Sequence, residues 1–431
     1  MAYKLKLPFL IFLFFVMSEV TFSQVLAQWR GFNRSGIYGE HELMDYWPNN
    51  GPEMIWATET IGAGYASPAV TKDKLYVNGE IDSTSYLFVF DLQGKLLWKA
   101  PNGKEFFGEG YSKSFPGARS TPSVYADLVY VSSGNGRIAC FDAITGNSQW
   151  SVDMVNDLGG KRSQFGYSES LLVDEKLVYC FPGGDQINFA ALDRFTGKTI
   201  WTSKALGDRA SFCSPVFIDL KELKILVTLS KEYLVGLDCQ TGELLWSHKL
   251  DSVVIEGEHC NTPVYSDGFI YYTAGDKNGN GAVKLSLSAD GRTIKEVWRN
   301  RNVDNAFGGM IKIGPYLYST VKSNKLKCVD VNTGSVVDSM SNVRGSLIYA
   351  DSLLYGYTYN GDVKLIKSRA MGKMELISKF KCDKGTQEHF SHPVISNGVL
   401  YIRHGKALMA YNIRKEKITD TNRECIREET H

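Results

Sequence analysis

The sequence is poor in features that mark several large classes of protein. Its 431 residues carry 48 Lys and Arg against 47 Asp and Glu, a formal net charge of +1. Without a basic excess, no field attracts nucleic acid, so we expect no nucleic-acid partner. The apolar run at residues 7–17 is too short for a membrane-spanning helix, which needs roughly 20 residues.

The short apolar run has the surroundings of a secretory signal. Lys4 and Lys6 precede it, and small residues follow at Ser23 and Ala27. A basic segment, a short apolar segment and a small-residue cleavage site predict a signal peptide at residues 1–27, cleaved after Ser23 or after Ala27. We expect an exported protein, periplasmic or secreted, with no transmembrane anchor in the mature chain.

Common metal and hydrolase motifs are missing as well. The eight cysteines show no CxxC spacing and no Cys/His cluster, so we expect buried thiols and no metal site. There is no GxSxG and no HExxH. "GNGRIA" (134–139) and "DKNGNG" (276–281) imitate nucleotide and calcium loops, but both lie between strand-like runs, and we expect turns.

A helical period of 3.6 residues is absent, but a repeated phrase is present. It reads "CFDAITGNSQW" (140–150), "ALDRFTGKTIW" (191–201) and "GLDCQTGELLW" (236–246). A second phrase runs ahead of it, as in "YASPAV" (65–70), "RSTPSV" (119–124) and "FSHPVI" (390–395). Because the second phrase recurs eight times, with β-branched and aromatic runs between the phrases, the chain contains eight units of about four strands.

Eight four-stranded units predict an all-β fold, an eight-bladed β-propeller of antiparallel blades. "EMIWATE" (53–59) looks like an outer strand with no blade before it, so we expect this N-terminal strand to close the ring in the last blade. The propeller should occupy residues 28–414 as a single domain. The charged segment 415–431 should form a flexible tail.

The repeats resemble the pyrroloquinoline-quinone (PQQ) enzyme repeat of quinoprotein alcohol dehydrogenases and the BamB-like family. Ala191, Asp193, the Thr-Gly pair 196–197 and Trp201 match the family's docking phrase. "QWRGFNRSGIYGE" (28–40) and "SHPVISNGVLYIR" (391–403) resemble secreted bacterial BamB-like or polyvinyl-alcohol dehydrogenase-like propellers. The resemblance implies that a small residue at the first position of the phrase, such as Cys140 or Cys328, makes room for a tryptophan of the neighbouring blade.

Residues just before the Ser/Thr position of the second phrase should lie near the channel mouth. In that column Glu169 and Asn261 are the polar, coordinating residues. In the quinoprotein dehydrogenases a Glu and an Asn hold calcium against PQQ, and an Asp, here Asp304, would be the base. The Cys-Cys pair and the CxxCH haem motif of such enzymes are missing.

Charged and aromatic side chains flank this column and suggest a binding rim. Together with Glu169 and Asn261, the candidate binding residues are Arg119, Arg162, Tyr167, His259 and His392; Lys161 and Arg344 flank them. No catalytic residue and no metal ligand is assigned. The sequence therefore predicts an exported binding or scaffold module, without a cofactor, for a cell-envelope protein or small ligand. The alternative is a PQQ- and calcium-dependent dehydrogenase acting on an alcohol or sugar.

Overall fold

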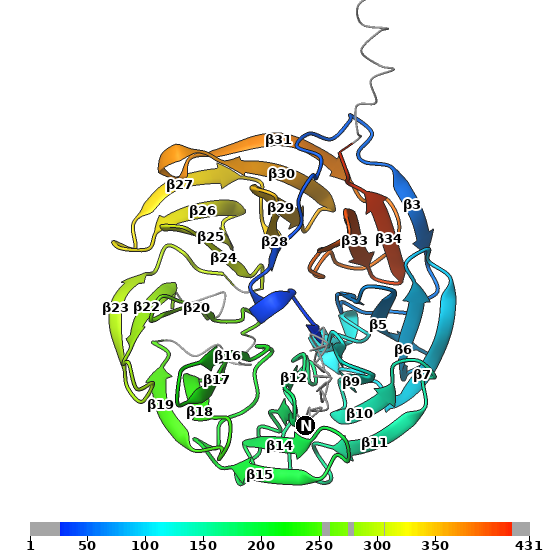
Figure 1. Cartoon of the computed structure of the whole chain (residues 1–431), viewed down its shortest axis with the longest axis vertical. Helices are drawn as coiled ribbons and strands as arrows, with labels where there is room; N and C mark the ends of the chain where they lie inside the picture. The colour runs from blue at the N-terminus through cyan, green and yellow to red at the C-terminus, as the bar shows by residue number, and fades with distance from the viewer. Residues whose placement is uncertain (1–25, 252–258, 275–279, 306, 416–431) are drawn as a thin grey trace, which may run out of the picture.

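Eight β-sheets stand side by side around a central axis (Figure 1). They come from a computed structural model, which describes residues 26–251, 259–274, 280–305 and 307–415. The described helices are three short 3-10 turns, η1 (Phe32–Arg34), η2 (Gly110–Ser114) and η3 (Ala370–Gly372). The predicted eight-bladed propeller of four-stranded antiparallel blades is confirmed.

Consecutive strands form each of the first seven blades, from the channel outwards. Blade 1 contains β4 (Ala69–Val70), β5 (Lys74–Ile81), β6 (Thr84–Asp91) and β7 (Leu96–Lys104), and blade 2 contains β8 (Ser123–Tyr125), β9 (Leu128–Ser132), β10 (Arg137–Asp142) and β11 (Ser148–Asp153). Blade 3 contains β12 (Leu172–Val173), β13 (Leu177–Cys180), β14 (Phe189–Asp193) and β15 (Thr199–Ser203). Blade 4 contains β16 (Val216–Asp219), β17 (Lys224–Leu229), β18 (Tyr233–Asp238) and β19 (Leu244–Lys249).

The second half of the ring repeats this order. Blade 5 contains β20 (Val264–Ser266), β21 (Phe269–Thr273), β22 (Ala282–Leu287) and β23 (Ile294–Asn300), and blade 6 contains β24 (Met310–Ile313), β25 (Tyr316–Val321), β26 (Lys325–Asp330) and β27 (Val336–Ser341). Blade 7 contains β28 (Gly345–Ala350), β29 (Leu353–Thr358), β30 (Asp362–Ser368) and β31 (Met374–Lys381). Blade 8 contains β32 (Val394–Ser396), β33 (Val399–His404), β34 (Ala407–Asn412) and the N-terminal strand β3 (Met54–Thr58). Middle strands are buried on both faces because other blades cover them, which explains their continuous apolar runs.

The N-terminal strand β3 closes the ring, as predicted, by pairing with β34 in antiparallel register. Two further N-terminal strands were not predicted. β1 (Leu26–Ala27) pairs with β8 of blade 2, and β2 (Ile37–Tyr38) pairs with β28 of blade 7. Since β1 precedes residue 28, cleavage after Ser23 would keep this strand and cleavage after Ala27 would remove it.

The repeated tryptophan phrase joins neighbouring blades. The Trp150 ring lies against Gly197 of the next blade, where an added Cβ would come within 2.6 Å of it, and its Nε1 donates to Arg194 O at 2.9 Å. Gly197 also has a positive φ of 71°, which favours glycine. Trp201 repeats the arrangement on Gly242 and Cys239 O.

The family resemblance implied a different role for the small first position of the phrase. The structure corrects it, because that position faces the tryptophan of its own blade. Cys140 pairs across the sheet with Trp150, and Cys328 with Asp338. A Cβ on Gly236 would lie 2.3 Å from the Trp246 ring, so a small residue is needed there.

The Ser/Thr positions of the second phrase form a hydrogen-bonded belt that links blades 1 to 4 at the channel. The N–H of Ser67 donates to Thr121 Oγ1, that of Thr121 to Ser170 Oγ, and that of Ser170 to Ser214 Oγ, each at 3.0 Å. The N–H of His392 donates to Ser67 Oγ at 2.8 Å, which carries the belt across the closure. This phrase therefore joins blades around the axis.

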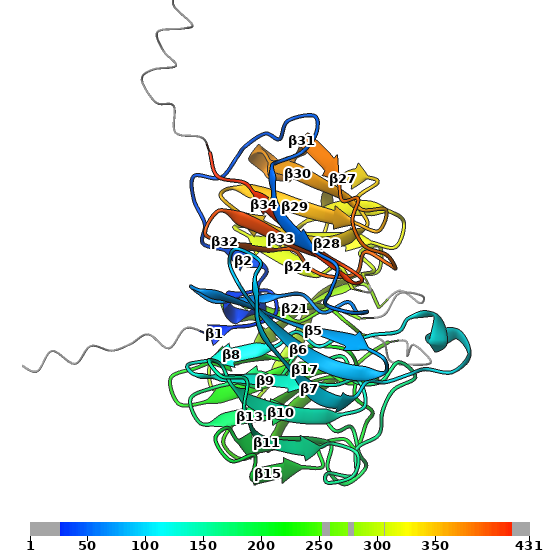
Figure 2. The ribbon, with the colours of Figure 1, turned by 90° about the vertical axis from the view of Figure 1, so that its right-hand side faces the viewer.

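The two faces of the ring carry different segments (Figure 2). The N-terminal residues lie along one face, where Leu43 N donates to Asp351 and Gly398 N to Glu40, both in turns after inner strands. The loop that carries η2 projects from the opposite face. The connections between blades reach the inner strands from that opposite face, because strands in each blade alternate in direction.

Several smaller expectations can be compared with the described residues. Seven cysteines are free and six of them are buried, as predicted; Cys425 lies outside the described residues. Residues 134–136 form the expected turn between β9 and β10, whereas most of "DKNGNG" lies outside the described ranges. Within those ranges, no helix has the length and hydropathy to span a bilayer. Signal residues 1–25 and tail residues 416–431 also lie outside them.

Candidate functional site

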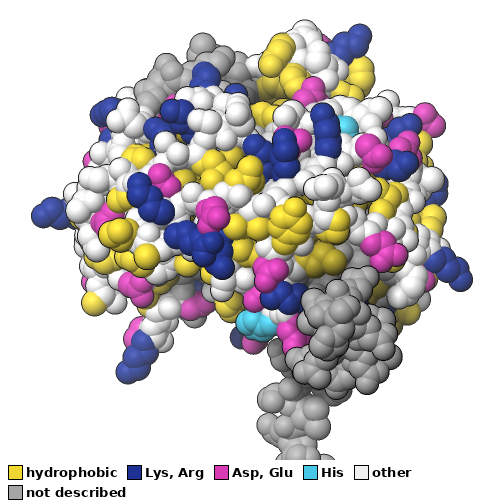
Figure 3. Space-filling view, turned by 90° about the horizontal axis from the view of Figure 1, so that it is seen from above, with side chains coloured by type: hydrophobic (Ala, Val, Ile, Leu, Met, Phe, Trp, Pro, Cys, Tyr) yellow, Lys and Arg dark blue, Asp and Glu magenta, His cyan; other side chains and the backbone are white. Residues whose placement is uncertain are grey.

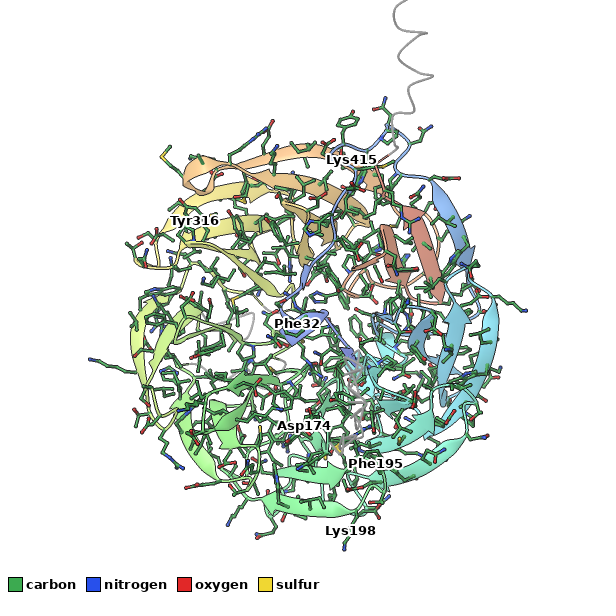
Figure 4. All side chains as sticks on the ribbon, viewed as in Figure 1. Phe32, Asp174, Phe195, Lys198, Tyr316 and Lys415 are labelled. Carbon is green, nitrogen blue, oxygen red and sulfur yellow. The ribbon has the colours of Figure 1, made fainter. Side chains whose placement is uncertain are left out.

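The N-terminal segment fills one end of the central channel. Figure 4 places Phe32, which is 80% exposed, at the centre of the ring. On either side of it, Arg30 and Arg34 are turned inward and are each 2% exposed. This end is called the closed end below.

Backbone carbonyls of several blades surround the two guanidinium groups. Arg34 Nη1 donates to Ser170 O at 2.8 Å, and Nη2 to Leu171 O at 2.7 Å. Arg30 Nη2 donates to Met310 O at 2.8 Å, and Nη1 lies 3.0 Å from His392 Nδ1. Segment 28–36 is therefore fastened to blades on opposite sides of the channel.

Burial lowers the pKa of Arg30 to about 10 and that of Arg34 to about 9, so both remain charged at neutral pH. Burial, together with the neighbouring charge of Arg30, holds the pKa of His392 below its usual range. His392 is therefore neutral and can accept a hydrogen bond from Arg30 at Nδ1. The closed end is a fixed positive framework.

Glu169 lies beside this framework, in the connection before blade 3. It is 3% exposed, and its Oε1 accepts a hydrogen bond from Phe181 N at 2.8 Å. Burial raises its pKa to about 7, although the Arg34 charge acts in the opposite direction. Its carboxyl group lines a small cavity with Cys180, Phe189 and Thr228.

Asn261, in the connection before blade 5, uses every polar atom of its amide. Its Nδ2 donates to Thr273 Oγ1 at 2.9 Å and to Asn305 O at 2.8 Å. Its Oδ1 accepts from Gly309 N at 2.8 Å. The side chain thus ties blade 5 to blade 6.

These contacts do not fit a calcium site made by Glu169 and Asn261. Asn261 Oδ1 is already bonded to a backbone N–H, and blade 4 stands between the two residues. Among the residues described, no three His, Cys, Asp or Glu side chains lie close enough together to hold a metal. We therefore derive no reaction step through calcium or PQQ.

The other predicted site residues lie in separate places. Tyr167 is buried and donates to Pro182 O at 2.8 Å; His259 is buried with Nε2 2.8 Å from Lys231 O. Arg162 is exposed and pairs with Asn135 Oδ1. Arg119, also predicted, lies at the other end of the channel, where it stands over the ring of Tyr65.

The end of the channel opposite segment 28–36 is called the open end, and it carries the residues two before the Ser/Thr position of the second phrase. We call these the mouth positions: Tyr65, Arg119, Ser168, Phe212, Cys260, Phe307, Arg344 and Phe390. Apart from Tyr65 at 9% exposure, all are half-buried. The residues between them and the belt, which include Glu169 and Asn261, are buried throughout.

Rings from several connections between blades meet at this end. Phe390 is their hub, with ring centroids 5.5 Å from Tyr65, 5.4 Å from Phe307, 5.3 Å from Tyr359 and 6.4 Å from Phe115. The mouth cluster is defined as these five rings with Phe165, Phe212, Arg119 and Arg344. Phe165 joins it at 5.9 Å from Phe115 and 6.1 Å from Phe212.

Two guanidinium groups lie over these rings. Arg119 Cζ is 5.5 Å from the Tyr65 centroid and 5.9 Å from that of Phe165. Arg344 Cζ is 4.8 Å from the centroid of Tyr359. The open end therefore combines an apolar surface with positive charge.

Four rings of the mouth cluster lie one residue before the column that contains Glu169 and Asn261, and they were not predicted. Successive residues of an extended chain point in opposite directions, so the column containing Glu169 turns into the blades and the preceding column turns to the mouth. The signal was available, since Tyr65, Phe212, Phe307 and Phe390 recur at the same offset from the belt. The outer wall of the ring differs in its charge from the open end, because Figure 3 shows side chains of both signs interspersed over it.

Comparison with known proteins agrees with the fold. A family profile described as "Outer membrane protein assembly factor BamB" matches residues 55–165 and 83–339, more than half of the chain. The protein of that name from Kangiella koreensis is 29% identical over 184 residues, covering 42% of this chain and 41% of that protein. The chain thus matches less than half the length of this relative.

Solved structures show the same architecture at low identity. BamB from Moraxella catarrhalis has a TM-score of 0.59 at 12% identity, covering 85% of this chain and 99% of that one. Quinohemoprotein alcohol dehydrogenase from Comamonas testosteroni has a TM-score of 0.60 at 11% identity, covering 90% and 80%. These likenesses show the fold alone, and the family follows from the profile. The chain belongs to the PQQ-like β-propeller family described by outer membrane protein assembly factor BamB.

Proposed function

We propose that this protein is an exported binding or scaffold propeller that holds a cell-envelope protein or ligand at the open end of its channel. The mouth cluster carries this proposal, because half-buried rings and two arginines converge there from separate connections. A surface of this kind suits binding, since aromatic and arginine side chains dominate interface energetics. The family name on the matching profile, an assembly factor, supports the same direction.

The dehydrogenase alternative receives no support from the geometry. The two residues that the resemblance offered for calcium, Glu169 and Asn261, are bonded within and between blades. A cofactor held by them would have to break these contacts. A binding role needs no such rearrangement.

A cofactor titration tests the choice between the two functions. Purified mature protein is titrated with PQQ and calcium and then assayed for dye-linked oxidation of alcohols and sugars. We expect neither saturable binding nor turnover. Turnover that is lost in Glu169→Ala would overturn the binding proposal.

Capture from an envelope extract tests the binding role itself. Immobilised wild type, Phe390→Ser and Lys198→Ser are compared by quantitative mass spectrometry. Lys198 is an exposed residue on the outer rim (Figure 4) and serves as the matched control. We expect an envelope protein retained by wild type and Lys198→Ser and lost by Phe390→Ser. Equal retention by all three would contradict binding at the mouth.

A further inference from the structure

We propose that the mouth cluster recognises an extended peptide segment whose every second position carries an aromatic or a carboxylate side chain, so that both kinds of side chain face the cluster. This inference rests on the proposed binding function and specifies the chemistry of its ligand. It follows from the side-chain chemistry of the rings, from the lack of a carboxylate partner for Arg344 among the described residues, and from the spread of the cluster over the mouth.

The rings favour an apolar ligand group over a sugar. Phe115, Phe165, Phe212, Phe307 and Phe390 have no hydrogen-bonding atoms in their side chains. The hydroxyl of Tyr65 is already committed, because it donates to Glu388 Oε2 at 2.8 Å. Five of the seven rings therefore offer only further ring contacts, which suit an aromatic side chain of the ligand.

Arg344 favours an anionic group next to that apolar group. Its guanidinium lies over Tyr359, and no carboxylate among the described residues is within ion-pair distance of it. Nor does its guanidinium donate a hydrogen bond to any residue in the described ranges. Since five N–H donors in a planar fork match a carboxylate in two places, a Glu or Asp of the ligand is the fitting partner.

Arg119 adds a second, fixed positive charge at another part of the cluster. Its guanidinium donates to Gly117 O at 3.0 Å and to Phe115 O, both in its own connection. These bonds hold the group over Tyr65 and Phe165. The apolar surface thus has positive charge beside Phe165 as well as beside Tyr359.

The arrangement suits an extended chain. The rings come from connections before blades 1, 2, 3, 4, 6 and 8, and Tyr359 comes from a turn in blade 7, so the cluster spreads over the mouth. In an extended peptide, residues two apart point to the same side, so rings and carboxylates at every second position can be presented to different parts of the cluster. A basic peptide would instead meet like charges, which costs affinity.

Fluorescence anisotropy with labelled peptides tests this chemistry. The probe GSFSESFSESG, in which Phe and Glu share one face, is compared with its charge-reversed form GSFSKSFSKSG and its ring-free form GSASESASESG. We expect a Kd of about 10–100 µM for the first peptide and affinities at least about tenfold weaker for the other two. Added salt should weaken the first peptide, because its carboxylates pair with exposed charge.

Variants assign the effect to named residues. Arg344→Gln should weaken binding of GSFSESFSESG about fivefold to tenfold and reduce the preference for this peptide over a form with Gln in place of Glu. Phe390→Leu should weaken it while keeping the Glu-over-Lys preference. Lys198→Gln should leave it unchanged. Thermal unfolding of each variant establishes that it is folded during the measurement.

Each outcome decides the inference. Equal binding of the Glu and Lys peptides, saturable binding of maltohexaose alone, or no peptide binding at about 1 mM would overturn it. If an envelope protein needs Phe390 but the peptides do not discriminate, the ligand chemistry is wrong and the binding function stands. If the peptides discriminate but no envelope protein is retained, the binding function fails and the ligand chemistry stands.

Discussion

The two ends of the channel differ in what surrounds their arginines. At the closed end, Arg34 is buried and its guanidinium donates to backbone carbonyls of blade 3. At the open end, Arg344 is half-buried over a ring and has no carboxylate partner among the described residues. The same side chain is therefore a fastening where backbone acceptors surround it and a binding group where they do not.

The largest effect on stability should come from the closed end. Arg34→Met removes a buried group that satisfies Ser170 O, Leu171 O and Gln28 Oε1. The acceptors left unpaired should lower the free energy of unfolding by about 3–5 kcal/mol, measured by urea denaturation. Lys198→Met is the control for loss of a surface charge. A loss below about 1 kcal/mol would mean that the two ends do not differ as described.

The fold could be predicted from the sequence because its devices repeat. The tryptophan phrase and the Ser/Thr belt recur in most blades, so eight units and the closing strand β3 were visible as a pattern. The closed end could not be predicted, because segment 28–36 occurs once and its partners, such as Met310 O, are backbone atoms far along the chain. Sequence patterns carry no information about such single long-range contacts.

The site was predicted in the right loops but largely in the wrong column. Choosing polar residues led to Glu169 and Asn261, which are polar because buried backbone groups need hydrogen-bond partners. Four of the eight neighbouring mouth positions are aromatic, and an aromatic residue in a β-rich chain is more often part of a core. Which of two adjacent residues faces the channel depends on how the connection packs, and the structure decides it.

The next largest effect on stability should come from a junction between two blades, which belongs to neither end of the channel. Trp150→Ala removes a half-buried ring from Gly197 and a hydrogen bond to Arg194 O. We expect the free energy of unfolding to fall by about 2–4 kcal/mol in urea denaturation. Peptide affinity at the mouth should be unchanged below the transition. A matching loss of affinity would show that the mouth depends on blade packing and is not an independent surface.

A smaller, pH-dependent effect should separate Glu169 from the mouth positions. Burial raises the pKa of Glu169 from its ordinary value of 4.5 to about 7, so its stabilising contribution is full below pH 4.5 and is lost as pH rises through 7. Glu169→Gln cannot titrate. Its stability relative to wild type should therefore rise by about 2 kcal/mol between pH 5 and pH 8.

Taking the difference between Glu169→Gln and wild type removes the other titrations. Burial and His404 lower the pKa of His389 to about 4, and this acts on stability with the opposite sign as pH rises from 4 to 6.5. That contribution is common to both proteins and cancels in the difference. Parallel stability curves for the two proteins would show that Glu169 is ionised in the folded state.

The smallest effect on stability should be at Arg344, the counterpart of Arg34 at the open end. Arg344→Met keeps an apolar stem over Tyr359 and leaves no described acceptor unpaired, so urea denaturation should change by no more than about 0.5 kcal/mol. The same substitution should weaken binding of the acidic aromatic peptide. A loss of stability comparable to that of Arg34→Met would instead assign Arg344 to the framework. Stability and affinity measured together on these two variants therefore separate an arginine that fastens the channel from one that is available to a ligand.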